Sequence, residues 1–89
     1  MRRVEVEIMG QRLTVASDEA EVHVRRVAGY VDGQMRQLAA GRASAGMADL
    51  ALQTALNIAS EYWKLQDQQE EVYRFIDRLS ERVRAQLGK

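Results

Sequence analysis

The chain has 89 residues, with 13 basic and 13 acidic side chains and therefore no formal net charge. A chain of this length forms one short domain, and its balanced charge argues against binding of nucleic acid or another acidic ligand. There is no cysteine, and no apolar run approaches the ~20 residues of a membrane-spanning helix. We therefore expect a cytoplasmic protein without disulfides or membrane insertion.

The first residues alternate between apolar and polar side chains. The alternation covers residues 4–8 and 12–15, and Gly10 lies between the two runs. This pattern predicts a β-hairpin over residues 3–16 with Gly10 at the turn. A two-stranded hairpin is marginally stable alone, so its apolar face must be covered by helices or by another subunit. That face would carry Val4, Val6, Ile8, Leu13 and Val15.

A first helix is predicted over residues 18–40. Ser17 or Asp18 can cap its start, and Asp18 with Glu21 has the spacing of a capping box. Gly41 fits a C-cap and opens an exposed, flexible loop over residues 41–46. A single core-facing stripe runs along the helix. It consists of Val24, Val27, Ala28, Val31, Met35 and Leu38.

The rest of the chain reads as one helix over residues 47–87, because this segment contains neither Pro nor Gly. At ~1.5 Å per residue it is longer than a compact domain of this size is wide, so it must leave its own domain. We predict a globular head over residues 1–63 and a tail over 64–89. Two apolar stripes mark the head part of the helix: Ala48, Ala51, Ala55, Ile58 and Tyr62 form one, and Leu52, Leu56, Ala59 and Trp63 form the other. The second stripe, which ends at Trp63, is expected to face its own head.

Only the first stripe continues into the tail, as a heptad seam. Because the rest of the chain is too short to cover this seam, it predicts an intermolecular coiled coil. A buried Gln69 would penalise other registers, and Tyr73 and Phe75 widen the apolar face, which favours four helices. The fold class is thus α+β: a hairpin, an amphipathic helix and a long C-terminal helix that forms an intermolecular coiled coil. The seam consists of Tyr62, Leu65, Gln69, Val72, Ile76, Leu79 and Val83.

Few residues indicate a catalytic, metal-binding or nucleotide-binding site. His23 is the sole histidine, and an exposed place in an early helical turn is favoured over a metal site. The acidic run of Asp67, Glu70 and Glu71 reads as a solvated helix surface rather than an acid/base pair. No phosphate-binding or dinucleotide fingerprint surrounds Gly10. We therefore expect no enzymatic activity, no catalytic residue, no cofactor and no metal.

Two segments resemble a known family. Residues 4–15 look like the N-terminal hairpin of the ZapA family of bacterial cell-division proteins, with a strand, a Gly turn and a second short strand. Residues 55–61, Ala-Leu-Asn-Ile-Ala-Ser-Glu, are similar to the A-L-N-I-x-x-E segment early in that family's long helix. With the first-helix stripe, the resemblance covers nearly the whole chain in the right order.

This resemblance implies a function that composition does not show. ZapA-like proteins bind the tubulin-like division protein FtsZ through their heads, dimerise, and join as antiparallel tetramers through their coiled coils. Such a tetramer bridges FtsZ protofilaments and promotes the Z-ring at the division site. By resemblance, the contact candidates lie in the hairpin turn and at the start of the long helix. They are Gln11, Arg12, Arg42 and Asp49.

Two other functions compete with a noncatalytic filament cross-linker. A generic coiled-coil adaptor or chaperone subunit would use the same oligomer for another protein partner. A small regulator that binds nucleic acid as a dimer is disfavoured by the neutral charge.

Overall fold

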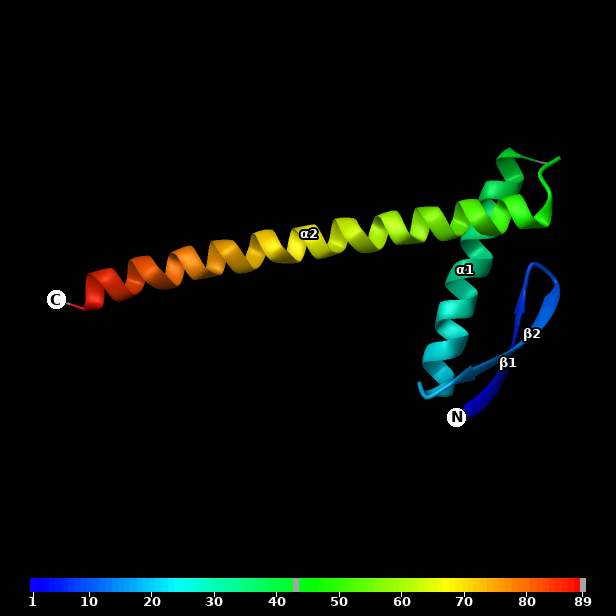
Figure 1. The fold of residues 1–89 in the computed structure, drawn as a ribbon, viewed down its shortest axis with the longest axis horizontal. Helices are drawn as coiled ribbons and strands as arrows, with labels where there is room; N and C mark the ends of the chain where they lie inside the picture. The colour runs from blue at the N-terminus through cyan, green and yellow to red at the C-terminus, as the bar shows by residue number, and fades with distance from the viewer. Residues whose placement is uncertain (43, 89) are drawn as a thin grey trace. The chain divides into compact units, whose positions relative to one another are not determined.

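The computed structural model describes residues 1–42 and 44–88, so Ala43 of the predicted loop lies outside the described residues. It contains β1 (Arg2–Ile8), β2 (Gln11–Ser17), α1 (Glu21–Gly41) and α2 (Met47–Leu87), in that order (Figure 1). The predicted α+β class, with a hairpin and then two helices, the second of them long, is confirmed. One compact unit covers Met1–Ala55, and a second begins at Leu56. The division into a head of residues 1–63 and a tail stays a prediction.

The hairpin packs against α1 through its first strand. β1 and β2 pair antiparallel, from Arg2 opposite Ser17 to Ile8 opposite Gln11. Figure 1 shows the hairpin beside α1, and their shared core contains the buried side chains Val4, Val6, Val24 and Ala28. Leu13 pairs with Val6 on the same face but remains 44% exposed, because α1 packs mainly against β1.

Helix α1 begins three residues later than its predicted start, so the proposed cap at Ser17 or Asp18 is wrong. Its N-cap is Ala20, which makes no side-chain cap. The Ser17 hydroxyl instead accepts the Glu19 N–H at 3.0 Å, a local turn that holds residues 17–19 outside the helix. At the other end Gly41 is the last helical residue, and Arg42 is the C-cap, with its N–H donating to the Ala39 carbonyl.

The buried face of α2 within the unit of residues 1–55 is not the predicted face. Leu50 and Thr54, one turn apart near the start of α2, are only 5% and 2% exposed. Leu52 lies about 200° round the helix axis from Leu50 and is 66% exposed. Trp63, at the end of the same stripe, is 65% exposed. The expectation that Leu52 faces its own head is therefore wrong, and the expectation for Trp63, which lies in the second unit, stays a prediction.

The buried Thr54 leads to a stability prediction. Its hydroxyl oxygen has no hydrogen-bond partner among the described residues. A buried, unpaired hydroxyl costs about 1–3 kcal/mol, so Thr54→Val, which keeps the shape, should raise the free energy of unfolding by about 1 kcal/mol. Denaturant unfolding at one fixed protein concentration measures this change. A loss of stability would mean that the hydroxyl has a partner in solution.

Candidate interaction surfaces

The hairpin turn has an unusual backbone for its sequence. Met9 and Gly10 connect the strands, and both have positive φ, 52° and 78°. Two positive values in a two-residue loop define a type I′ turn, which usually begins with Asn, Asp or Gly. Met9 lacks such a side chain, and its left-handed conformation costs roughly 1–3 kcal/mol. The turn therefore requires support from elsewhere in the unit.

That support comes from Asp32 on α1. The Met9 N–H donates to Asp32 Oδ1 at 2.7 Å, across 23 positions of sequence. Arg36, one turn further along α1, donates its Nε–H to both carboxylate oxygens at 3.1 and 3.0 Å. The hydrogen bond from the Met9 backbone, followed by that from Arg36, lowers the pKa of Asp32 below its ordinary value. Asp32 is therefore a charged acceptor at neutral pH, and it ties the turn to the helix.

Gln11 and Arg12 follow this turn on β2 and are exposed. Arg12 lies opposite Glu7 in the strand register, and its Nη1 is 3.8 Å from Glu5 Oε1. Because Val4 and Val6 face α1, Glu5, Glu7 and Arg12 belong to the outward face of the hairpin. The predicted contact residue Arg12 therefore sits in a mixed-charge patch, and exposed ion pairs of this kind contribute at most about 1 kcal/mol.

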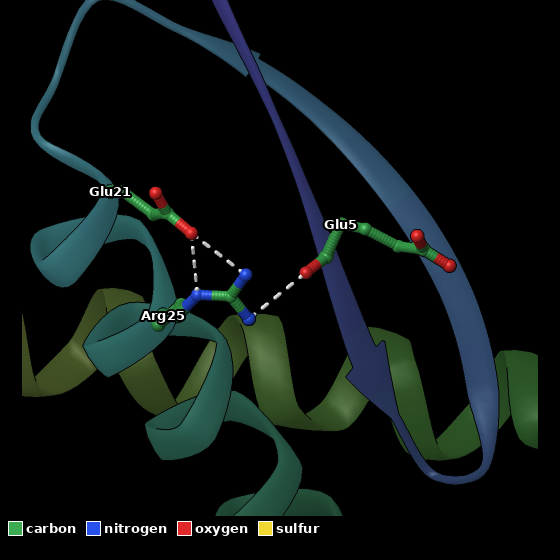
Figure 2. Close-up of polar contacts among 3 residues, drawn as sticks. All are labelled: Glu5, Glu21 and Arg25. Atoms are coloured by element: carbon green, nitrogen blue, oxygen red, sulfur yellow. Dashed lines mark hydrogen bonds and ion pairs between the residues drawn. The ribbon is translucent and has the colours of Figure 1, made fainter.

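A second polar link joins α1 to the middle of β1 (Figure 2). Arg25 donates from Nε and Nη2 to Glu21 Oε1 at 3.0 and 2.8 Å, and from Nη1 to the Glu5 backbone oxygen at 3.2 Å. The Glu5 carboxylate points away from Arg25 in this view, toward β2. Arg25 thus fixes the strand through its backbone and leaves the Glu5 side chain on the outward face.

The other two predicted contact residues flank the connection between the helices. Arg42 caps α1, and its carbonyl accepts the Ala45 N–H at 3.0 Å. Asp49 lies in the first turn of α2, where the helix dipole favours an acidic side chain. Both side chains are exposed. The four candidates thus form two pairs within the first unit, one on the hairpin and one at the helix connection.

The predicted seam is uncovered in the single chain. Its six apolar members are between 43% and 60% exposed, and Gln69 is exposed too. Consecutive members line shallow grooves on one side of α2: Leu65, Gln69 and Val72 in one, and Ile76, Leu79 and Val83 in the next. Tyr73 and Phe75 beside the seam are also exposed. Such a continuous apolar surface is typical of a site for a partner.

Other kinds of site find little support in the part of the chain that the structure describes. Within residues 1–42 and 44–88, no three His, Cys, Asp or Glu side chains gather closely enough to hold a metal ion. His23 lies exposed in the first turn of α1, beside an apolar groove between this helix and the hairpin. Among the same residues no helix is both long and apolar enough to cross a membrane.

Sequence reasoning missed Asp32 and Arg25, which connect α1 to the hairpin. A signal for Asp32 was present, because it follows Ala28 by four residues and precedes Met35 by three. These spacings place it on the core-facing side of α1. An acidic residue on that side requires a partner, but the Met9 backbone that supplies it lies too far away in sequence to be inferred.

The fold and these surfaces define a class of small α+β protein, in which a hairpin and a helix carry exposed polar groups and a long second helix leaves an apolar seam uncovered. The chain belongs to the ZapA family: the family model described as cell division protein ZapA matches residues 4–86.

Individual relatives agree with this assignment. The chain is 41% identical over 70 residues to the cell division protein ZapA of Bacillus thuringiensis, covering 79% of each chain. It is 36% identical over 86 residues to the ZapA of Geobacillus thermodenitrificans, covering 97% of this chain and 87% of the relative. Among solved structures, a ZapA mutant dimer from Geobacillus stearothermophilus matches with a TM-score of 0.71 and 34% identity, covering 85% of this chain and 88% of that one.

Proposed function

We propose that this chain is a noncatalytic cross-linker that binds FtsZ and bundles its protofilaments, promoting Z-ring assembly at the division site in the cytoplasm. The observation that carries the proposal is the uncovered apolar seam on α2, in a chain that belongs to the ZapA family. A protein whose heads bind filaments and whose tails join heads needs no catalytic group.

In this proposal the tail over residues 64–89 assembles the protein. Two chains form a dimer, and two dimers join along the seam as an antiparallel tetramer. From Tyr62 to Val83 the seam is roughly 30 Å long at the ordinary helical rise. The exposed Tyr73 and Phe75 beside it give each helix a broad apolar face, which suits a four-helix core better than a two-stranded coil. Antiparallel joining places heads at both ends.

The head over residues 1–63 makes the filament contacts in this proposal. Gln11 and Arg12 at the hairpin, with Arg42 and Asp49 at the helix connection, are exposed polar groups. Charged groups at the rim of an interface mainly set association rate and specificity. Several heads in one tetramer then raise the overall affinity, because the second engagement is effectively intramolecular.

Cosedimentation with polymerised FtsZ tests the contact residues. We expect the parent chain to pellet with FtsZ polymers, and Arg12→Glu with Arg42→Glu to weaken this binding by about tenfold or more, since two reversed charges then face a surface complementary to arginine. The matched control is Arg3→Glu with Arg26→Glu, which makes the same charge change at two exposed arginines outside the candidate set. The mass of each variant in solution should stay that of the parent.

The possible outcomes distinguish a wrong choice of partner from a wrong choice of contact residues. A parent chain that forms tetramers but never pellets with FtsZ would refute the filament function and leave the general adaptor function standing. A candidate variant that pellets as well as its control would show that Arg12 and Arg42 lie outside the contact surface.

A further inference from the structure

We propose that Asp32 is a positioning residue for the hairpin: through the Met9 N–H it holds the turn of Met9 and Gly10 in the shape that presents Arg12 to the filament. This inference rests on the proposed function, in which the hairpin takes part in the contact. Asp32 lies on α1 and need not touch the partner itself.

The geometry of the turn sets the position of Arg12. Ile8 pairs with Gln11, so only Met9 and Gly10 connect the strands, and both have positive φ. A two-residue loop of this type matches the twist of the flanking strands. A loop with Met9 in an ordinary conformation would splay the strands or change their pairing. The position of Arg12 on the outward face thus depends on a conformation that Met9 does not favour.

A hydrogen bond from the Met9 N–H to Asp32 stabilises this conformation. In a two-residue hairpin loop the strand ladder uses the groups of the closing pair, here Ile8 and Gln11, and the N–H of the first loop residue points away from the ladder. That N–H belongs to Met9 and donates to Asp32 Oδ1 at 2.7 Å. This length is typical of a bond to a charged acceptor. Arg36 holds both carboxylate oxygens at about 3 Å, so the acceptor is itself fixed in place.

The pairing of the strands decides which side chains form the contact surface. A register slip of one residue would move every side chain of β2 to the opposite face of the hairpin. Arg12 would then leave the patch that it shares with Glu5 and Glu7 and turn toward α1. Together with the buried apolar face of the hairpin, Asp32 therefore holds Arg12 on the outward face, from a helix 20 residues later in sequence.

The test compares Asp32→Ala with a variant that keeps the acceptor. We expect Asp32→Ala to weaken cosedimentation with polymerised FtsZ by about fivefold or more, and Asp32→Asn, whose amide oxygen can still accept the Met9 N–H, to stay within about twofold of the parent. The control Arg25→Ala removes the polar link from α1 to the Glu5 backbone of β1 and leaves the turn bond intact, so it should also stay within about twofold. All four proteins should have the same mass in solution.

A rescue separates a role in turn shape from a general loss of stability. Asn-Gly is the preferred pair in a type I′ turn, so Met9→Asn should restore binding to within about twofold in the Asp32→Ala chain, and should leave binding unchanged in the parent. The Met9 amide resonance reports the bond without FtsZ. Its position should move strongly in Asp32→Ala and little in Arg25→Ala.

Failure of this inference differs from failure of the proposed function. If the parent binds FtsZ and Asp32→Ala binds it equally well, only the positioning role of Asp32 would be overturned. The positioning role would also be overturned if the Met9 amide resonance does not move in Asp32→Ala, or if Met9→Asn does not restore FtsZ binding in the Asp32→Ala chain. A parent chain that does not bind FtsZ would overturn the proposed function, and with it the purpose assigned to the turn.

Discussion

Replacing Ile76 and Leu79 by Glu is expected to convert the proposed tetramer into dimers. Both side chains belong to the exposed seam and line its grooves. In a packed core their replacements would bury unpaired carboxylates next to one another, and each uncompensated buried charge costs about 3–5 kcal/mol. Dimer–dimer association should therefore weaken by about a hundredfold or more. Sedimentation equilibrium measures the change directly.

The matched control places two glutamates on the outer side of the same helix. Arg74→Glu with Arg78→Glu changes heptad positions that lie away from the seam, and this variant should keep the mass of the parent. A seam variant that remains tetrameric at tens of micromolar would show that the chains assemble through another surface.

Leu50→Ala has the second large expected effect, because it empties a buried site where α2 meets its own unit. Leu50 is 5% exposed, and Leu→Ala at such sites costs about 2–5 kcal/mol in the free energy of unfolding. Leu52→Ala removes the same atoms two positions later, from a side chain that is 66% exposed. It should cost at least about 2 kcal/mol less than Leu50→Ala.

Denaturant unfolding of the two leucine variants, at one protein concentration, decides which face of α2 belongs to its own unit. Equal losses, or a larger loss for Leu52→Ala, would mean that Leu52 is buried in its own unit. A larger loss for Leu50→Ala agrees with the face observed in the structure.

The sequence predicted the elements well where local signals were strong. The bounds of α2 match the prediction, because no Pro or Gly interrupts residues 47–87 and Gly46 precedes them. Alternation around Gly10 located the hairpin turn. The start of α1 was wrong because several residues near Ser17 can cap a helix, and the Ser17 hydroxyl is used in a turn instead.

Contacts between elements were harder to predict. When a helix is apolar on two sides, the sequence does not indicate which side packs against its own unit. Thr54 is a polar residue, yet it is buried one turn from Leu50. The bond between Met9 and Asp32 joins a backbone group to a side chain 23 positions away. No periodicity marks such a contact, so the support for the candidate turn emerged only from the structure.

In the proposed assembly the tails join the heads, so that one assembly bridges two filaments. Electron microscopy of FtsZ polymers, with the parent chain and with the Ile76→Glu, Leu79→Glu variant at equal filament occupancy, tests this bridging. We expect bundles with the parent and single, decorated protofilaments with the dimeric variant, since each dimer keeps its heads but loses the link between them. If a variant verified as dimeric still bundles protofilaments as well as the parent, the tails do not form the bridge.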